Sequence, residues 1–319
     1  MRRLTYFALS LLLAVPLFAS DDVIRRGFNV AEGGTLRLDA SFGGVKIVSG
    51  GTGVAVEIVR KARGRDGEER MREHRITIEQ RGNDVVIDGG SNRINFSFFE
   101  WGDYEVQWNI RVPARYNLDV RTSGGSVDLA DIGGTVEAKT SGGSIRTGRL
   151  AGRARLTTSG GSIRVGGGTA EIIAHTSGGS IEIGNTTGRV EAKTSGGSIT
   201  LAQVGGDVYA RTSGGGIRIE DAGGTVDAST SGGSITASLS RQLSGDSRLS
   251  TSGGSVNVAV ASSVKLDLDA QASGGGVRSD LPITVRGTQE DNAIRGQING
   301  GGPTLTLRSS GGGIRVKPL

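Results

Sequence analysis

The 319-residue chain contains no cysteine. This absence excludes a disulfide framework, a thiolate metal site and a lipidated N-terminal cysteine. Histidine occurs only as His74 and His175, and neither has a second histidine close to it in the sequence. A zinc site or a histidine-based catalytic triad needs partners that the sequence does not place beside them. The sequence therefore predicts no catalytic residue, no cofactor and no metal, and we expect the protein not to be an enzyme.

Aromatic residues are scarce at 4% of the chain, whereas 56 residues are glycine. A glycine-rich composition without periodicity is typical of disorder. Here the glycines recur at fixed intervals, which reverses that conclusion. The formal net charge of +5 falls to +3 without Arg2 and Arg3. This charge is too small to indicate a nucleic-acid partner.

A short motif, "TSGG", recurs along the second part of the chain. Its first seven copies begin 18 residues apart, and the later copies at Thr251 and Ala272 ("ASGG") each follow after 21. A last copy, "SSGG", begins at Ser309. The seven regular copies begin at Thr122, Thr140, Thr158, Thr176, Thr194, Thr212 and Thr230. A fixed period near 20 residues predicts a solenoid.

Each repeat divides into two halves, such as "TSGGSVDLA" (122–130) and "DIGGTVEAK" (131–139). Each half has a Gly-Gly turn and then alternating apolar residues, the pattern of a short strand. We therefore expect an all-β, single-stranded β-solenoid of the parallel β-helix or β-roll type, with 18-residue coils of two short strands. Successive coils would lie about 4.8 Å apart. About ten to eleven coils after residue 120 would then form a rod about 50 Å long.

Equivalent residues of successive coils should form columns along the rod. The parity of the strands turns the "TSGG" threonines inward or onto a corner. It turns charged residues outward, in a basic column of Arg121, Lys139, Lys193 and Arg211 beside a column of Asp119, Glu137, Glu191 and Tyr209. Opposite charges side by side on a sheet are mutually favourable. The columns are consistent either with a solvated, self-neutralised face or with a ligand-binding strip.

The first 20 residues have the pattern of a signal peptide, with Arg2 and Arg3 before an apolar run that is short for a membrane span. The cleavage site falls after Ala19 or Ser20. We therefore expect an exported protein without a membrane span after signal removal, located in the periplasm, on the outer-membrane surface or outside the cell. The domains predicted are a signal peptide (1–20), an N-terminal β-rich region (21–121) and the repeat solenoid (122–319).

The N-terminal region should form a cap of β-strands that includes one short helix. Residues 33–50 already contain two Gly-Gly strand units, and residues 54–62 read as a longer strand. Residues 65–74 contain good helix formers. A hairpin should turn about Gly82 and Asn83, and Pro113 should end a later strand.

Most of the aromatic residues lie between residues 96 and 116. Two interpretations remain open for them. They could form an aromatic plug that closes the open end of the solenoid. Alternatively, Phe98, Phe99, Trp101, Tyr104 and Trp108 could form an exposed platform for a sugar ring or a protein partner. At the other end, we expect Lys317 and Pro318 to protect an open C-terminal edge.

Known chemistries of repeat proteins find little support in the sequence. A calcium-binding β-roll needs an aspartate at a set place after each glycine pair, and arginine often stands there instead, as in Arg146 and Arg164. Carbohydrate-active enzymes built on β-helices need clustered acids in a groove, and no coil breaks the repeat with such a cluster.

Several segments together resemble the bacterial putative-adhesin family of β-strand-repeat proteins. They are "GGTLRLDASFGGVKIVSGG", the helical interruption after it, "NIRVPARYNLDVRTSGGSV" and the repeated "TSGGSI". The resemblance covers roughly residues 28–319 and implies an envelope-associated β-solenoid without agreed catalytic or binding residues. It indicates an adhesin or scaffold whose partner is a glycan or protein at the cell surface. The alternatives are a periplasmic structural or envelope-stress protein without an external ligand, and a carbohydrate-active enzyme.

Overall fold

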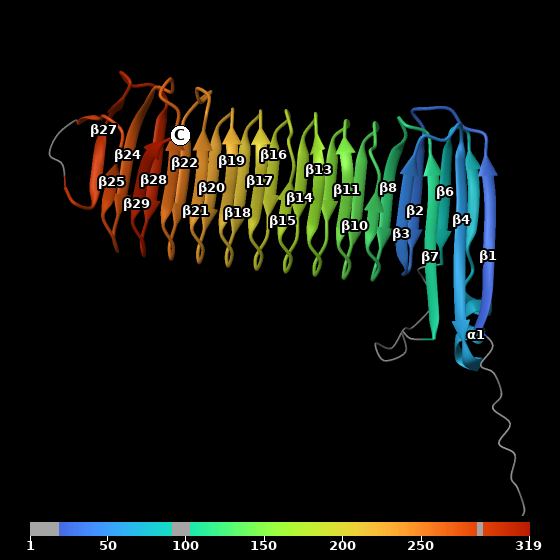
Figure 1. Ribbon diagram of the computed structural model, residues 1–319. Helices are drawn as coiled ribbons and strands as arrows, with labels where there is room; N and C mark the ends of the chain where they lie inside the picture. Colours follow the sequence, from blue (N-terminus) through green and yellow to red (C-terminus); the bar gives the residue numbers. More distant parts are fainter. Residues whose placement is uncertain (1–18, 91–102, 286–289) are drawn as a thin grey trace, which may run out of the picture.

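The computed structural model describes residues 19–90, 103–285 and 290–319. In these residues the chain forms two long sheets, which we name sheet A and sheet B, with 14 and 15 strands respectively. One helix, α1 (Gly64–Glu73), lies at one end. The sheets face each other and form a flattened rod (Figure 1). The predicted all-β solenoid is confirmed.

The central part of the rod, which we call the array, consists of coils that each give one strand to each sheet. Its strands in sheet A are β9 (Val127–Leu129), β11 (Ile145–Leu150), β13 (Ile163–Gly168), β15 (Ile181–Ile183), β17 (Ile199–Val204), β19 (Ile217–Ala222), β21 (Ile235–Leu239) and β23 (Val256–Val260). Its strands in sheet B are β8 (Asn117–Thr122), β10 (Val136–Thr140), β12 (Ala154–Thr157), β14 (Ile172–His175), β16 (Val190–Lys193), β18 (Val208–Thr212), β20 (Val226–Thr230) and β22 (Ser247–Thr251). All neighbouring strands of the array are parallel.

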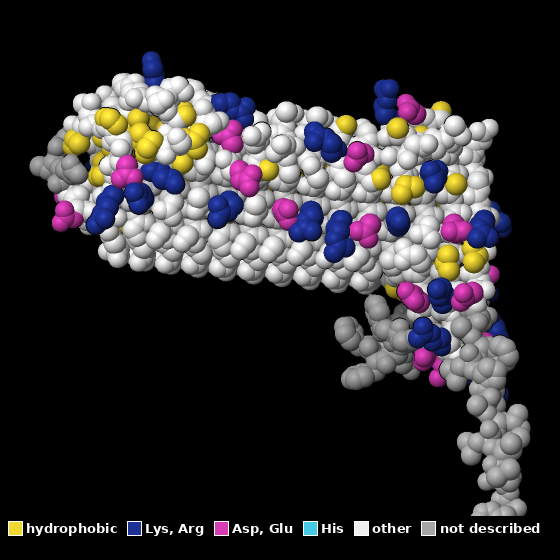
Figure 2. Space-filling model, viewed as in Figure 1, with side chains coloured by type: hydrophobic (Ala, Val, Ile, Leu, Met, Phe, Trp, Pro, Cys, Tyr) yellow, Lys and Arg dark blue, Asp and Glu magenta, His cyan; other side chains and the backbone are white. Residues whose placement is uncertain are grey.

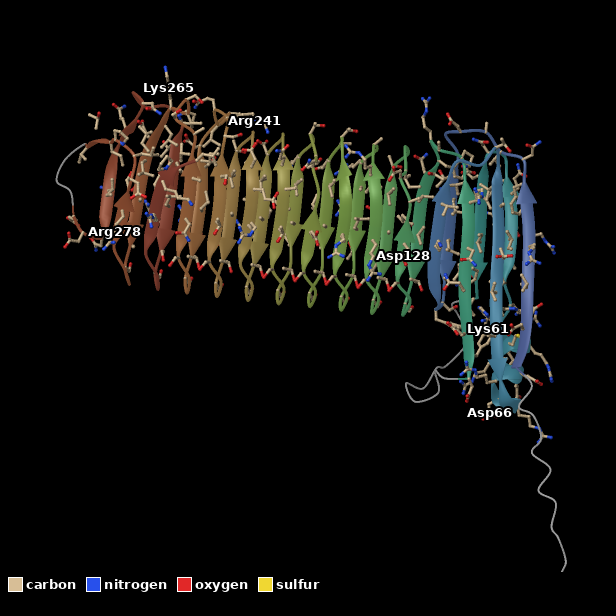
Figure 3. The ribbon with its side chains drawn as sticks, viewed as in Figure 1. Lys61, Asp66, Asp128, Arg241, Lys265 and Arg278 are labelled. Carbon is tan, nitrogen blue, oxygen red and sulfur yellow. The ribbon has the colours of Figure 1, made fainter. Side chains whose placement is uncertain are left out.

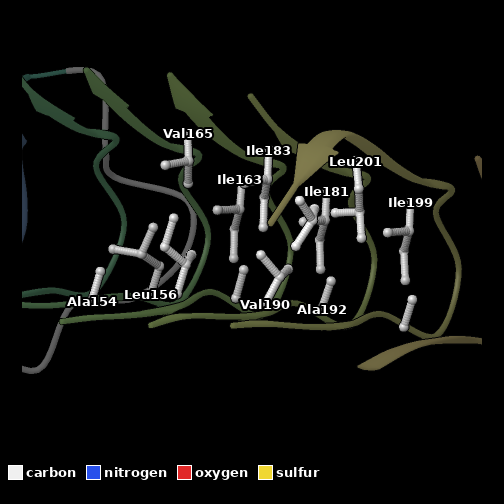
Figure 4. Close-up of a cluster of buried hydrophobic side chains, with 14 of the residues drawn as sticks. Ala154, Leu156, Ile163, Val165, Ile181, Ile183, Val190, Ala192, Ile199 and Leu201 are labelled. Carbon is white, nitrogen blue, oxygen red and sulfur yellow. The ribbon is translucent and has the colours of Figure 1, made fainter. Parts of the chain in front are cut away.

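The core of the array follows from the alternation of side chains along each strand. Val127, Ile145 and Ile163 occupy the same register position in successive coils and are fully buried. In sheet A the inward residues include many isoleucines, as in Ile181 and Ile183. In sheet B they are smaller, as in Val190 and Ala192 (Figure 4). Large residues from one sheet thus pack on small residues from the other.

The "TSGG" threonines are buried at a corner of the coil, as the sequence predicts. Thr158 is 3% exposed, and its hydroxyl donates a hydrogen bond to the Gly143 carbonyl of the preceding coil, with an oxygen–oxygen distance of 2.7 Å. The same bond recurs for Thr140, Thr176, Thr194, Thr212, Thr230 and Thr251. Each coil is therefore tied to the previous one by a side chain as well as by the backbone ladder.

The second glycine of each "TSGG" motif is required by close backbone contact between coils. A Cβ atom on Gly143 would lie 2.1 Å from the Gly125 carbonyl oxygen, which is far inside van der Waals contact. A Cβ atom on the neighbouring Gly142 would lie 3.6 Å from the nearest atom, the Gly124 oxygen. Only the second glycine is therefore sterically obligatory at this corner.

The N-terminal end of the rod carries a structure that we call the cap. It consists of β1 (Ala19–Phe28), β4 (Val54–Arg63), α1, β5 (Thr77–Arg81), β6 (Asp84–Gly89) and β7 (Tyr104–Val112). The predicted helix, the hairpin about Gly82 and Asn83, and the strand end before Pro113 are confirmed. Strand β1 has no counterpart in the sequence prediction. It pairs antiparallel with β4, and Ala19 and Ser20 lie at its start, so the predicted cleavage would remove its first one or two residues.

The coils at this end are not stacked in chain order. Strands β2 (Thr35–Ala40) and β3 (Gly44–Ser49) form a coil that pairs directly with β8 and β9. The later strands β6 and β7 lie outside them, against β2 and β3 respectively. The first coil is therefore held between the cap and the array.

At the C-terminal end, too, the coils are not stacked in chain order. The chain continues from β23 to β24 (Leu266–Ala272) and β25 (Val277–Ser279), then through β26 (Thr284–Val285) and β27 (Ala293–Ile298). It then returns, so that β28 (Thr304–Ser309) and β29 (Ile314–Pro318) lie between the coil of β22 and β23 and the coil of β24 and β25.

The prediction of an open edge at the C-terminal strand is therefore corrected: β29 is not the outermost strand, because β25 pairs with residues 314–316. Lys317 and Pro318 pair with β23 on one side and lie past the residues of β29 that pair with β25. The outermost strands in the described part of this end are β25 in sheet A and β26 in sheet B. Antiparallel pairing of β27 with β24 and β26 ends the parallel stack there.

Candidate functional site

The outward side of sheet A, which we call face A, carries one continuous column of polar residues. Strand register aligns Lys46, Asp128, Arg146, Arg164, Glu182, Thr200, Arg218, Thr236, Asn257, Arg315 and Arg278 in successive strands from β3 to β25. Figure 2 looks onto this face and shows the column as a row of blue and magenta side chains along the rod. Arg278 marks its C-terminal end, and Asp128 lies within it (Figure 3).

The outward side of sheet B, face B, carries the two columns that the sequence predicts. Asp119 is in register with Glu137, and Arg121 with Lys139. Farther along, Glu191 is in register with Tyr209, and Lys193 with Arg211. The prediction that these columns share one outward face is confirmed.

Face B is extensively paired around Glu191. The Lys193 ammonium nitrogen lies 2.6 Å from Glu191 Oε1, and His175 Nε2 lies 3.0 Å from the same oxygen. The hydrogen bond from Lys193, supported by His175, lowers the pKa of Glu191 against the opposing effect of burial. Lys193 Nζ and Arg211 Cζ lie 4.8 Å and 4.6 Å from the ring centroid of Tyr209. This part of the face is consistent with a self-neutralised surface.

Face A is hollowed at two places. Near the N-terminal end a hollow of about 680 Å³ lies over β1, β4, β7 and β3, lined by Arg25, Arg26, Lys46, Glu57, Asn109 and Arg111 among others. It forms where the small residues Gly27, Ala55 and Val48 lie between these long side chains. Its lining holds four cationic side chains and one acidic side chain.

The second hollow, of about 510 Å³, lies over β19, β21, β23 and β29 near the C-terminal end. Its charged residues are Arg218, Arg315 and Lys317, and its lining contains no acidic residue. A smaller hollow of about 360 Å³ on face B has mixed charges, with Arg37, Arg153 and Arg155 beside Asp119 and Glu137. The two hollows of face A are therefore the more strongly cationic.

Of the five residues predicted to form an aromatic platform, the structure describes Tyr104 and Trp108. Tyr104 and Trp108 are 5% and 0% exposed, because β7 turns them into the cap together with Val106 and Ile110. The Trp108 indole nitrogen donates a hydrogen bond of 3.0 Å to the Phe42 carbonyl oxygen. These two residues therefore do not offer a ring to a ligand, and the platform prediction is wrong for them. Phe98, Phe99 and Trp101 lie outside the described residues.

His74, which the sequence presents as an isolated histidine, lies in the core of the cap. It is 3% exposed and lies against the rings of Phe42, Tyr104 and Trp108. Nε2 donates to the Gly89 carbonyl oxygen at 2.7 Å, so Nδ1 accepts from the Tyr104 hydroxyl at 2.7 Å. Burial, supported by the nearby Arg60 cation, lowers the pKa of His74, and burial raises the pKa of Tyr104 to about 12. The sequence could not reveal this cluster because its members come from distant segments.

The described residues contain no group of three or more histidine, aspartate or glutamate side chains that could hold a metal ion. Within the same residues, no helix is long and apolar enough to cross a membrane.

A family model matches residues 45–317, from within β3 to within β29. The chain belongs to the Toastrack DUF4097 family. The match of this Toastrack chain therefore includes the whole array, the C-terminal closure and most of the cap. It confirms the resemblance to β-strand-repeat proteins that the sequence suggested. No curated protein matches the chain.

Several solved structures are similar to this Toastrack chain at low sequence identity. A putative adhesin from Bacteroides fragilis NCTC 9343 is 14% identical with a TM-score of 0.40, over 93% of this chain and 97% of the other. A putative lipid binding protein from Parabacteroides distasonis ATCC 8503 is 11% identical with a TM-score of 0.40, over 92% and 96%. A putative cell adhesion protein from Clostridium sporogenes ATCC 15579 is 11% identical with a TM-score of 0.25, over 95% and 100%. Likenesses at this level do not decide the function of this chain.

Proposed function

We propose that the protein is an exported, non-enzymatic binding or scaffold protein of the cell envelope, of the adhesin type. The observation that supports this most directly is the register of the array. Equivalent residues from β3 to β25 form one unbroken outward column on face A. Such a face can offer polar contacts at a fixed spacing to a partner that itself repeats.

The construction of the array favours this role physically. A rod whose coils are joined by backbone ladders keeps its outward side chains at fixed spacing, so binding orders little of the protein. Repeated weak contacts to one partner then add to a much higher effective affinity than a single contact. This gives the repetition of the "TSGG" turn a purpose beyond building the rod.

Screening the mature chain against a panel of glycans and extracellular-matrix proteins at physiological salt tests the binding role. We expect saturable binding to at least one member of the panel. No binding across the panel would favour the alternative of a structural or envelope-stress protein without an external ligand. Turnover of a glycan or ester that a point change in one coil abolishes would contradict a non-enzymatic role.

Protease added to intact cells tests the location that the predicted signal peptide implies. A surface adhesin is cut under these conditions, whereas a periplasmic protein is spared until the outer membrane is opened. We expect cleavage on intact cells. Protection would contradict the surface location and would favour the periplasmic alternative.

The prediction of an aromatic ligand platform now concerns Phe98, Phe99 and Trp101. If it holds, Trp101→Ala lowers affinity for the partner found in the panel while the free energy of unfolding changes little. A loss of about 3–5 kcal/mol of stability, as for large-to-small core changes, would instead favour an aromatic plug.

A further inference from the structure

Face A and face B both carry cations without an ion pair, but in the hollow of face B such cations lie beside the acids Asp119 and Glu137. On face A each of Asp128, Glu182 and Asp280 lies within an ion-pair distance of an arginine, at 3.6 Å, 2.7 Å and 2.8 Å respectively. Among the described residues of this face, several cations are left without an acidic partner within 4 Å. They are Lys46, Lys61, Arg111, Arg218, Arg278 and Lys317.

Four of these six unpaired cations line the two hollows. Lys46 and Arg111 line the N-terminal hollow, and Arg218 and Lys317 line the C-terminal one. Glu105 and Glu220 are unpaired acids on strands of the same face, but neither lines a hollow. Each hollow therefore presents a local excess of positive charge to any group that enters it.

The hollows also contain neutral hydrogen-bonding side chains without a partner in the protein. Asn109 lines the N-terminal hollow, and Thr236, Ser238 and Asn257 line the C-terminal one. Hydroxyl and amide groups of this kind can both donate and accept hydrogen bonds. A ligand that fits must therefore carry acidic groups for the cations and hydroxyl groups for these side chains.

From this chemistry we propose that face A binds an acidic polysaccharide, lying along the rod from one hollow to the other. Its carboxylates contact Lys46, Arg111, Arg218 and Lys317, and its hydroxyls contact the asparagine, threonine and serine side chains. The proposal deepens the proposed binding function and rests on it. Seven strand spacings, about 34 Å, separate β3 from β21, so the ligand is an extended chain and not a single sugar.

The lining of the hollows favours a polysaccharide over other anionic polymers. Neither hollow contains an aromatic side chain on which a nucleic-acid base could stack. Apolar residues in the C-terminal hollow are mostly small, as in Ala259 and Pro318, and do not offer a broad surface for insertion into a membrane.

The test measures binding of the mature, folded chain to polygalacturonate at physiological salt, with dextran, single-stranded DNA and anionic phospholipid vesicles as comparison probes. Two variants each remove two unpaired cations from a hollow of face A: Lys46→Gln with Arg111→Gln, and Arg218→Gln with Lys317→Gln. The matched control, Lys139→Gln with Arg248→Gln, removes two exposed cations of face B that also have no ion pair. All three carry the same change in net charge, and circular dichroism checks that each is folded.

We expect polygalacturonate to bind saturably and dextran not to bind. Each face A variant should bind at least about tenfold more weakly, because the loss of even one hydrogen bond to a charged group, worth about 1.5–3 kcal/mol, lowers affinity by that factor. The face B variant should change affinity less than about twofold. Equal weakening of all three variants would overturn the proposal, because it indicates binding by net charge alone. Equal or tighter binding of DNA or vesicles would overturn it as well.

The two experiments distinguish failure of the acidic-polysaccharide proposal from failure of the proposed binding function. If polygalacturonate does not bind but another glycan or protein of the screening panel does, the acidic-polysaccharide proposal is wrong and the proposed function remains. If nothing in either experiment binds, both are wrong.

Discussion

The array and the cap are two parts of one rod, but they are held together in different ways. The array buries mostly aliphatic residues and repeats the same threonine bond at each corner. The cap buries Trp108 and Tyr104 around His74, against Phe42 of the first coil, and uses antiparallel pairing. The comparison indicates that stability is spread evenly along the array and concentrated in a few large side chains in the cap.

The two parts also differ in whether their contacts repeat from one layer to the next. Successive array coils make equivalent core, corner and backbone contacts. We therefore expect that one coil can take the place of another. The cap connects β1, β4 and α1 through individual contacts, such as Arg60, which pairs with Asp22 and donates to the Met71 and His74 carbonyl oxygens at 3.0 Å and 3.2 Å. We therefore assign closure of the end to the cap, whose strands β1, β4 and β7 also form the N-terminal hollow, and the repeated outward columns to the array.

The largest expected effect of a single change is in the cap. Trp108→Ala removes the largest fully buried side chain and should lower the free energy of unfolding by about 3–5 kcal/mol, measured by denaturant unfolding. Tyr209→Ala on the array surface, which removes an aromatic ring of similar kind, should cost less than about 1 kcal/mol. Similar losses for the two would contradict a cap held by large side chains.

A smaller but still large effect should follow from crowding one corner of the array. Gly143→Ala places a Cβ atom 2.1 Å from the Gly125 oxygen and should cost about 1–3 kcal/mol through forced separation of two coils. The adjacent Gly142→Ala, with 3.6 Å to the nearest atom, is the matched control and should cost well below this amount. Thermal unfolding of both variants measures the difference. Equal midpoints would show that the close contact between Gly143 and the Gly125 oxygen does not exclude a side chain.

The threonine column should contribute less per residue. Thr176→Val keeps the shape of the side chain but removes the 2.7 Å hydrogen bond to the Gly161 carbonyl, at a cost of about 1 kcal/mol. Thr187→Val, an exposed threonine that bonds the Thr169 carbonyl at 3.2 Å, should cost only a few tenths of a kcal/mol. If the two changes cost the same, burial of the corner bond has no special role.

The smallest expected effect is the pH dependence that His74 in the cap contributes between pH 7.5 and 5.5. Because the pKa of His74 is lowered in the folded state, the unfolded chain binds the proton more strongly. The stabilisation is therefore complete above the unfolded-state pKa of about 6.5 and decreases as the pH falls below it. Denaturation midpoints at pH 7.5 and 5.5 should differ more for the wild-type chain than for His74→Gln. An unchanged difference in the variant would argue against the buried neutral histidine.

The sequence predicts the array well because each coil repeats a local rule. The alternation of residues such as Ile163 and Val165, the inward threonines and the outward charge columns all follow from a period of two within strands. The helix at residues 64–73 and the hairpin about Gly82 follow equally from local propensity. These features need no knowledge of distant contacts.

The order of coils at the ends could not be predicted for a physical reason. The segment "SSGGGIRV" at residues 309–316 has the pattern of any other coil, such as "TSGGGIRI" at 212–219, and a parallel ladder accepts any such coil as a neighbour. Only the connections through β26 and β27 place it between β23 and β25. Likewise, the platform residues Tyr104 and Trp108 are buried by contacts with Phe42 and His74 that the local sequence does not reveal. The cationic hollows of face A also depend on strands that are distant in the sequence, such as β1, β3 and β7.

Deleting one coil tests the central claim, that each 18-residue unit is an independent and exchangeable layer of the rod. Removing residues 159–176 joins Thr158 to Ser177 and brings Arg155 beside Glu191 and Arg146 beside Glu182. Removing only residues 159–167 instead shifts every later strand into the opposite sheet. The "TSGG" corner at Thr176 would then lie on the other side of the rod from the corners at Thr140 and Thr158, and the column of threonine hydrogen bonds would be broken. We predict that thermal unfolding followed by circular dichroism shows a cooperative, near wild-type transition for the 18-residue deletion and a strongly lowered or absent one for the nine-residue deletion. An unfolded 18-residue deletion, or two deletions of equal stability, would contradict the account.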